Sequence, residues 1–171
     1  MKKQTLEVGS SEVRQVLGGI SFFTQMDDAS LNRIAKNISF RKYKRDEIIL
    51  REGETCLGLC ILQSGTVKLF RLSPLGHQFI LHLCVEHEIF NEFSTFDGGT
   101  NEISVQAMEP SEIWVVDPAY LRDLVAKDID FCKKVVEVFS QNYRGLVNNI
   151  SNMAFTRRRS LKRDQNPGEL E

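Results

Sequence analysis

Apolar and polar positions follow two different periods along this chain. Between residues 39 and 117, short apolar runs are separated by glycine or polar turns, a pattern that predicts short β-strands. The runs are Glu47–Leu50, Leu57–Leu62, Val67–Leu72, Phe79–Val85, Ile103–Ala107 and Ile113–Val116. Between two of them, Gln63-Ser64-Gly65-Thr66 predicts a hairpin turn, because glycine supplies the positive φ that such turns need. Regular short strands of this kind predict an antiparallel β-barrel or jelly roll.

Helical spacing precedes the predicted strands. Residues 1–10 are polar and are expected to be flexible, and residues 11–37 indicate two short helices. Phe22 and Phe23 form an apolar hinge between the two helices, and Asp27 or Asp28 can cap the second one. Together with the strands, these helices predict an α+β fold.

A long helix with a heptad repeat follows the predicted strands. Asp117 and Pro118 first indicate the cap and first turn of a short helix. The long helix is expected over residues 126–156, starting near Asp128, and would be roughly 40 Å long. Apolar residues recur along it with alternating spacings of four and three, at Cys132, Val136, Phe139, Tyr143, Leu146, Ile150 and Met153. Such a seam is typical of a coiled coil.

The heptad seam predicts a homodimer. A barrel of about a hundred residues cannot cover so long an apolar stripe, so a second copy of the same helix is the natural partner. The expected interface consists of Val136, Phe139, Tyr143, Leu146, Ile150 and Met153. A second stripe of Val135, Val138 and Val147 would then face the barrel of its own chain. The alternative is that the helix packs only on its own barrel.

Composition narrows the class of protein. Hydrophobic residues make up 42% of the chain and charged residues 26%, so a core can form. The net charge is −1, which argues against general binding of polyanions. Residues 157–171 are basic at first and end in Pro167-Gly168, and we expect a disordered tail there, with phosphate contact as the alternative. The chain has only four cysteines, too sparse for a secreted disulfide scaffold, and this predicts a cytoplasmic protein with reduced thiols. It lacks an apolar leader and an apolar run of membrane-spanning length, so no membrane partner is expected.

Four segments, in their order along the chain, resemble the sensor domain of Crp/Fnr transcription regulators. They are Tyr43–Gly53, Gln63–Leu69, Phe90-Asn91-Glu92-Phe93-Ser94 and Asn152-Met153-Ala154-Phe155. The resemblance implies a cyclic-nucleotide-binding-like double-stranded β-helix over residues 11–125, a small-molecule effector and a regulatory, non-enzymatic role. It stops near residue 160, where family members continue into a winged helix-turn-helix domain. DNA would therefore be reached only through that missing C-terminal domain or a full-length partner.

The resemblance also assigns candidate effector contacts. Members of the family bind cyclic nucleotide through a carboxylate, which corresponds to Glu92, and a phosphate-binding arginine, which corresponds to Asn101. Glu102 then places a negative charge where the phosphate would lie, and Leu146-Val147 replace the polar pair that contacts adenine. Cyclic AMP is therefore not expected to bind in the usual way. The candidate pocket residues are Phe90, Asn91, Glu92, Phe93, Ser94, Asn101, Glu102, Leu146 and Val147.

The same segment suggests an apolar pocket. Phe90, Phe93 and Phe96 could lie opposite Leu146 and Val147, which would suit a hydrophobic ligand or non-covalent haem. Haem in a gas sensor for nitric oxide or carbon monoxide needs an axial ligand, for which the candidates are His77, His82 and His87. By strand periodicity His82 and Cys84 share one face. The alternative is that these histidines are ordinary edge and turn residues.

Enzyme and iron–sulfur chemistry are disfavoured. The chain has three histidines in no metal-enzyme spacing and lacks phosphate-loop, nucleophile-elbow and zinc-protease motifs. No cysteine precedes Cys56, which argues against the N-terminal cluster of the iron–sulfur branch. Cys56 and Cys60 are expected to be a reduced pair.

Overall fold

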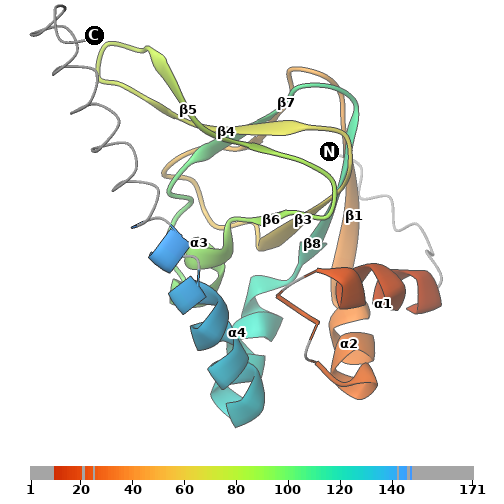
Figure 1. The fold of residues 1–171 in the computed structure, drawn as a ribbon. Coiled ribbons are helices and arrows are strands. Elements are labelled where there is room, and N and C mark those ends of the chain that lie inside the picture. Colours follow the sequence, from red (N-terminus) through yellow and green to blue (C-terminus); the bar gives the residue numbers. More distant parts are fainter. Residues whose placement is uncertain (1–9, 21, 25, 142, 146, 148–171) are drawn as a thin grey trace, which may run out of the picture. The chain divides into compact units, whose positions relative to one another are not determined.

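The computed structural model describes residues 10–20, 22–24, 26–141, 143–145 and 147. The chain divides into two units between Phe131 and Cys132. The first unit holds eight strands and four helices (Figure 1). None of the helices in the described part of the chain has the length and apolar character needed to cross a lipid bilayer.

The strands form two four-stranded antiparallel sheets. One sheet has the order β1 (Ile38–Tyr43), β8 (Ser111–Val116), β3 (Leu59–Ser64) and β6 (Ile89–Phe90). The other has the order β2 (Ile48–Leu50), β7 (Ser104–Ala107), β4 (Val67–Leu72) and β5 (Gln78–Cys84). This arrangement confirms the predicted α+β jelly roll. Strands β1 and β6 were not among the predicted runs, since β1 carries charged residues and β6 has only two residues.

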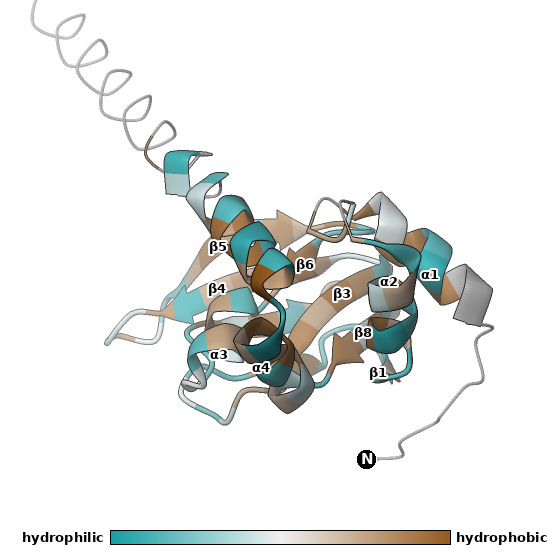
Figure 2. Ribbon diagram, turned by 90° about the horizontal axis from the view of Figure 1, so that it is seen from below, coloured by the Kyte–Doolittle hydropathy of each residue, from teal (hydrophilic) through white to brown (hydrophobic). Residues whose placement is uncertain are grey.

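Period-two alternation places the apolar side chains between the two sheets. Cys60 and Leu62 of β3, and Ile113 and Val115 of β8, are at most 3% exposed and belong to one core cluster. Val105 of β7 joins the same cluster from the opposite sheet. Figure 2 shows hydrophobic residues along β3, with mixed faces on helices α1 (Ser10–Gly19) and α4 (Pro118–Lys127). This core holds both sheets in place and fixes where their loops emerge.

The predicted helix caps are confirmed. Asp27 precedes α2 (Asp28–Ala35), and its carboxylate accepts a hydrogen bond from the Ser30 amide at 2.7 Å. Asp117 caps α4 in the same way, accepting from the Tyr120 amide at 2.7 Å, with Pro118 in the first turn. Helix α3 (Glu92–Asp97) was not expected from the sequence.

The Phe22-Phe23 pair is a packing centre, which corrects the expected hinge. Both rings are fully buried and meet edge to face, with ring centroids 5.0 Å apart. Phe22 also stacks on Phe96 of α3 at 5.8 Å and meets Phe131 edge-on at 6.5 Å. The link between the two N-terminal helices is therefore tied to α3 and to the residue that precedes Cys132 in the long helix.

The long helix begins where the sequence places it. Asp128 has an extended backbone, and its carboxylate caps the start of the long helix. It accepts hydrogen bonds from the Asp130 and Phe131 amides at 3.1 and 3.0 Å. Residues 129–141, 143–145 and 147 are helical. Leu146, Ile150, Met153 and the basic segment 157–171 lie outside the described residues, so those expectations stay predictions.

The two apolar stripes of this helix differ in exposure. On the heptad seam, Val136 is 58% exposed and Tyr143 is 68% exposed. On the second stripe, Val135 and Val138 are buried, whereas Val147 is 43% exposed. The seam thus carries large apolar side chains in contact with solvent in the single chain.

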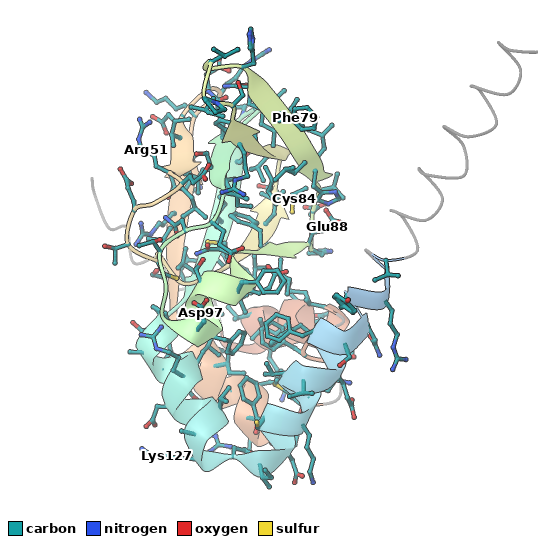
Figure 3. All side chains as sticks on the ribbon, turned by 90° about the vertical axis from the view of Figure 1, so that its left-hand side faces the viewer. Arg51, Phe79, Cys84, Glu88, Asp97 and Lys127 are labelled. Carbon is teal, nitrogen blue, oxygen red and sulfur yellow. The ribbon has the colours of Figure 1, made fainter. Side chains whose placement is uncertain are left out.

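Strand β5 is the exposed edge of its sheet. It pairs with β4 on one side, and six of its seven residues are exposed. Phe79, which is 72% exposed, projects away from the sandwich (Figure 3). The ends of β5 lie in turns that contain Gly76 at one end and His87 at the other, both with positive φ.

Two hairpin glycines provide a matched stability test. Gly65 has φ +90°, as predicted for its turn, and a Cβ there would lie 2.7 Å from the Pro110 carbonyl oxygen. Gly76 has φ +80°, but a Cβ there would meet no atom within 4 Å. We expect Gly76→Ala to lower the free energy of unfolding by about 1 kcal/mol, the cost of left-handed backbone alone, and Gly65→Ala to lower it by more than ~2 kcal/mol because a clash is added. Urea unfolding measures both, and equal losses would contradict this account.

Candidate functional site

The segment that follows β6 is held in place by Asn91. Its φ is +66°, in the left-handed region that asparagine tolerates better than most residues. Asn91 is 6% exposed, and its amide nitrogen donates to the Gly58 carbonyl at 3.0 Å and to the Cys56 sulfur at 3.4 Å. His87, in the turn before β6, also has a positive φ, of 69°, but its side chain is exposed. Asn91 therefore serves as a brace between this segment and residues 56–58.

Glu92 is the first residue of α3 and lies partly buried. Burial raises the pKa of its carboxyl group, its own backbone N–H lowers it, and the negative charge of Glu102 raises it again, so that the pKa lies above the ordinary value. The negative charge of Glu102 therefore reaches the Glu92 carboxyl group, an interaction that the sequence did not indicate. Glu102 itself is exposed.

Asn101 is committed to the backbone of a neighbouring loop. Its side chain is 3% exposed, and its amide nitrogen donates to the carbonyl oxygens of Arg51 and Thr55 at 3.1 and 3.4 Å. Its backbone N–H donates to Glu54 and its carbonyl accepts from Gly53, both at 2.8 Å. Its Oδ1 atom is buried without a hydrogen-bond partner among the described residues. Asn101, which the resemblance predicts to replace a phosphate-binding cation, is thus a neutral amide whose donors are in use.

The three phenylalanines do not gather in one pocket, which corrects that expectation. Phe90 belongs to the core between the sheets and is 1% exposed. Phe96 stacks on Phe22 in the helical layer, and Phe93 is 47% exposed. Ser94 is buried, Val147 is partly exposed and Leu146 lies outside the described residues.

Sequence reasoning missed two residues that tie α3 to its surroundings. The hydroxyl of Thr95, which is fully buried, donates to the Asn91 carbonyl at 2.7 Å. Arg122 of α4 donates to the Thr95 carbonyl at 2.9 Å, near the C-terminal end of α3 where a cation is favourable. Neither residue stands in a recognisable motif, so only the fold reveals them.

The described residues of the first unit border two cavities of note, each lined by one set of side chains. One has a volume of about 260 Å³ and is bordered by strands β1 and β2 and the loop that follows them. Its lining residues are Arg41, Tyr43, Ile48, Ile49, Leu50, Arg51, Glu54, Thr55, Leu57 and Asn101. The other, of about 390 Å³, is lined by Arg33, Tyr120, Asp123, Leu124, Lys127, Asp128 and Ile129. Asn101 is the only predicted effector residue in either lining, and neither cavity contains a histidine.

The three histidines lie in different surroundings. His77 is exposed in the β4–β5 turn, where its amide donates to the Ser73 hydroxyl at 3.1 Å, and His87 is exposed in the β5–β6 turn. His82 Nε2 lies 3.1 Å from Glu88 Oε2. The described residues thus give haem no shared histidine-lined site, and haem binding stays an untested prediction.

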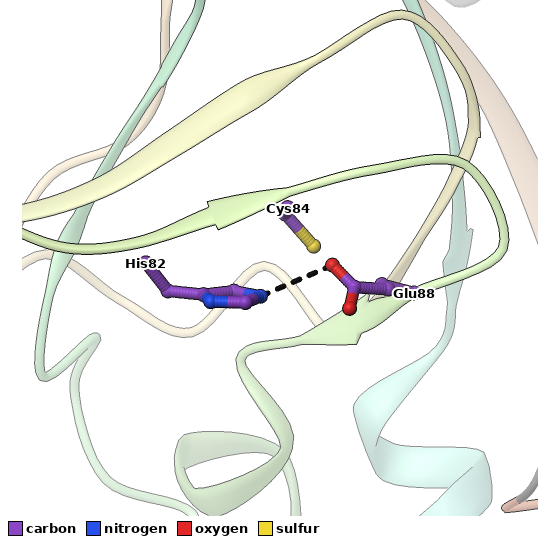
Figure 4. Close-up of side chains that lie close together, drawn as sticks. All are labelled: His82, Cys84 and Glu88. Atoms are coloured by element: carbon purple, nitrogen blue, oxygen red, sulfur yellow. Dashed lines mark hydrogen bonds and ion pairs between the residues drawn. The ribbon is translucent and has the colours of Figure 1, made fainter.

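His82 and Cys84 do share a face of β5, as predicted, and Glu88 completes a cluster that the sequence did not indicate. The three possible ligand atoms all lie within 4.8 Å of one another (Figure 4). Glu88 reaches this position through the β5–β6 turn. All four cysteines are free thiols, and Cys60 is fully buried. Burial, and the nearby Cys56, raise the pKa of the Cys60 thiol.

Comparison with known proteins identifies this architecture. A family model for the cyclic nucleotide-binding domain matches residues 40–128. A curated "CRP-like cAMP-activated global transcriptional regulator" of Mycobacterium tuberculosis is 24% identical over 142 residues, which cover 83% of this chain and 63% of that protein.

Solved structures show the same fold. The sensor domain of the transcriptional regulator DNR from Pseudomonas aeruginosa superposes with a TM-score of 0.71 at 23% identity, covering 81% of this chain and 93% of that one. The catabolite activator protein of Thermus thermophilus gives a TM-score of 0.68 at 21% identity, covering 79% of this chain and 63% of that one. At these identities the likeness establishes the fold.

The interaction between the two carboxylates can be tested directly. We expect Glu102→Gln to lower the pKa of Glu92 without returning it to the ordinary value, because burial is the larger cause of the shift. Carboxyl-carbon NMR titration measures that pKa, and Glu86→Gln, at an exposed turn position, serves as the control. Because the pKa of Glu92 is higher in the folded than in the unfolded chain, the free energy of unfolding falls as the pH rises from the unfolded-state pKa through the folded-state pKa. Glu92→Gln should make this fall in the free energy of unfolding smaller. An unchanged pKa in Glu102→Gln would contradict the electrostatic reading.

Proposed function

Because this chain belongs to the cyclic nucleotide-binding domain family, we propose that it is the effector-sensing and dimerisation module of a Crp/Fnr-type transcription regulator. In this proposal the chain does not bind cyclic AMP in the way that is usual for the family. The role is regulatory, with no catalytic step. Output on DNA would come from a DNA-binding domain outside these residues or from a full-length partner chain.

The hydrogen bonding of the neutral Asn101 side chain is the observation that carries this proposal. A cyclic phosphate is an anion and needs donors that are free to reach it, usually including an arginine. The Asn101 amide is neutral, and its nitrogen donates both of its hydrogen bonds to backbone carbonyls. Glu102 beside it adds a carboxylate, and its repulsion of a phosphate costs about a kcal/mol or more in a partly buried site. Glu92 alone retains the family's contact chemistry.

Packing around α3 supports a route from the effector loop to the long helix. Phe96 of α3 stacks on Phe22, which in turn contacts Phe131, and Arg122 joins α4 to the end of α3. Phe131 directly precedes the heptad seam. A shift of α3 on effector binding would therefore change the packing at the start of the long helix, which is how coupled helix movements act in regulators.

The exposed heptad seam supports dimerisation. Val136 and Tyr143 are large apolar side chains with more than half of their surface exposed. Burial of such residues against a second copy of the helix would remove that surface from water. The position of Phe139 on the same seam extends the stripe across the described part of the helix.

Cyclic AMP binding tests the first part of the proposal. Calorimetric titration of the wild-type chain should show no saturable heat, whereas Asn101→Arg combined with Glu102→Ala should bind at least about tenfold more tightly, a gain of ~1.4 kcal/mol. Thermal unfolding checks that the double variant folds. Glu102→Ala alone changes only an exposed side chain and should bind more weakly than the double variant. Tight, saturable binding of cyclic AMP by the wild type would refute the proposal.

A charge on the seam tests dimerisation. We expect Val136→Glu to shift the chain to monomer at concentrations where the wild type is dimeric, because an ionised side chain would be buried in the interface. Gln141→Glu adds the same charge at an exposed position of the same helix outside the seam and should stay dimeric. Sedimentation velocity measures both. If the two variants had the same monomer–dimer distribution, the seam would not be the dimer interface.

A further inference from the structure

We propose that His82, Cys84 and Glu88 form a binding site for a divalent transition-metal ion with the chemistry of Zn²⁺. The three side chains bring an imidazole nitrogen, a sulfur and a carboxylate oxygen within 4.8 Å of one another. Figure 4 shows these groups converging on one point beside the end of β5. The proposal concerns a site separate from the effector loop, and it does not depend on the function proposed above.

The fold brings the three ligands together by two local features. Residues 82 and 84 lie on one face of β5 because side chains alternate along a strand. The β5–β6 turn then returns Glu88, whose carboxylate accepts from the Val85 amide at 2.9 Å. Backbone hydrogen bonds join this turn to β3: the Leu62 amide donates to the Glu88 carbonyl at 3.0 Å, and the His87 amide donates to the Leu62 carbonyl at 2.7 Å. The ligands therefore stand on a framework that is already ordered.

The distances suit a tetrahedral ion. Nitrogen, oxygen and sulfur ligands at their usual distances of about 2.0–2.3 Å from zinc lie roughly 3.3–3.8 Å from one another. The His82 Nε2 and Glu88 Oε2 atoms are 3.1 Å apart, and no ligand pair exceeds 4.8 Å. Small side-chain rotations would place all three on one ion. The side chains of His82 and Glu88 are 55% and 41% exposed, which leaves solvent access for water as a fourth ligand.

The donor set favours zinc over the hard cations. A thiolate with an imidazole is typical of zinc sites, whereas magnesium and calcium take oxygen ligands. Burial, with the charge and hydrogen bond of Glu88, raises the pKa of the Cys84 thiol, so the sulfur is protonated in the free chain. On binding, the S–H bond breaks, a zinc–sulfur bond forms and one proton is released to solvent.

The Glu88 carboxylate is ionised and held in one orientation, as a metal ligand must be. Burial raises the pKa of Glu88, but hydrogen bonds from the Val85 amide, His82 and Cys84 outweigh that effect and hold the pKa below its ordinary value. Glu88 is thus ionised, and the Val85 amide orients it as outer-shell donors orient metal ligands. The exposed contact between His82 and Glu88 contributes little to stability by itself, whereas Cys84 is buried as a member of the core cluster between the sheets.

The site would act on the start of the effector loop. Glu88 immediately precedes β6, and β6 leads into Asn91 and Glu92. An ion held by two residues of β5 and by Glu88 would clamp the β5–β6 turn. Metal binding would therefore restrict the segment from which α3 begins.

Cobalt titration tests the proposal on the whole chain. The chain is freed of metal with chelator, kept reduced, and titrated anaerobically with Co²⁺, which reports a thiolate ligand by a near-ultraviolet charge-transfer band. We expect saturation at one equivalent per chain, with Zn²⁺ abolishing the band by displacement. His82→Ala and Glu88→Gln alter exposed or half-exposed residues and should weaken binding at least about tenfold.

Matched variants separate this site from other thiols and histidines. Cys84→Ser should abolish the charge-transfer band, whereas Cys132→Ser and His87→Ala should retain it. Circular dichroism verifies the fold of each variant, and His82→Ala and Glu88→Gln decide the matter if Cys84→Ser does not fold. Absence of a stoichiometric thiolate band in the wild type, or a band unchanged in both His82→Ala and Glu88→Gln, would overturn the proposal.

Discussion

The apolar contact between the two four-stranded sheets is the constraint on which the rest of the structure depends. Removal of this surface from water is the main favourable contribution to folding, and it requires each strand to present alternate residues inward. Cys60 and Leu62 on β3 meet this requirement together with Val105 on β7. Once the sheets are joined in this way, the turns between strands emerge at fixed places, and the functional segments are confined to them.

The turn chemistry around β6 combines structural and functional roles. His87 and Asn91 flank this two-residue strand, and both have left-handed backbone conformations. The exposed His87 contributes only its backbone, whereas the buried Asn91 also braces residues 56–58 through its amide group. Asn101 has a similar role across the neighbouring loop. Amide groups that would be candidates for ligand contact are thus engaged in holding the effector loop.

Two groups of side chains connect this loop to the parts of the chain around it. An aromatic group of Phe22, Phe96 and Phe131 joins α3 to the N-terminal helices and to the residue before the heptad seam. On the other side, the cluster of His82, Cys84 and Glu88 joins the edge strand β5 to the turn before β6. A ligand at either place would act on the same short segment, residues 88–97, because both groups are attached to it.

Local patterns in the sequence predicted most of the elements of this fold. Short apolar runs between turn residues predicted most of the strands, the carboxylates of Asp27 and Asp117 predicted the helix caps, and Gly65 predicted a hairpin turn. Each of these depends on residues within a few positions of one another. The correspondence of Asn101 to a phosphate-binding cation came from the resemblance to the family and stays a prediction.

Only the tertiary structure decided how side chains from distant segments meet. Strand β6 is too short to carry a periodicity, and it forms because β3 offers it hydrogen bonds. The directions of Phe90 and Phe96, the bonds from Asn101 to Arg51 and Thr55, and the contact of Arg122 with Thr95 all join residues far apart in sequence. Glu88 joins His82 and Cys84 through the geometry of one turn. Such contacts are set by the packing of the sheets and helices, and a linear pattern of residue types does not contain that information.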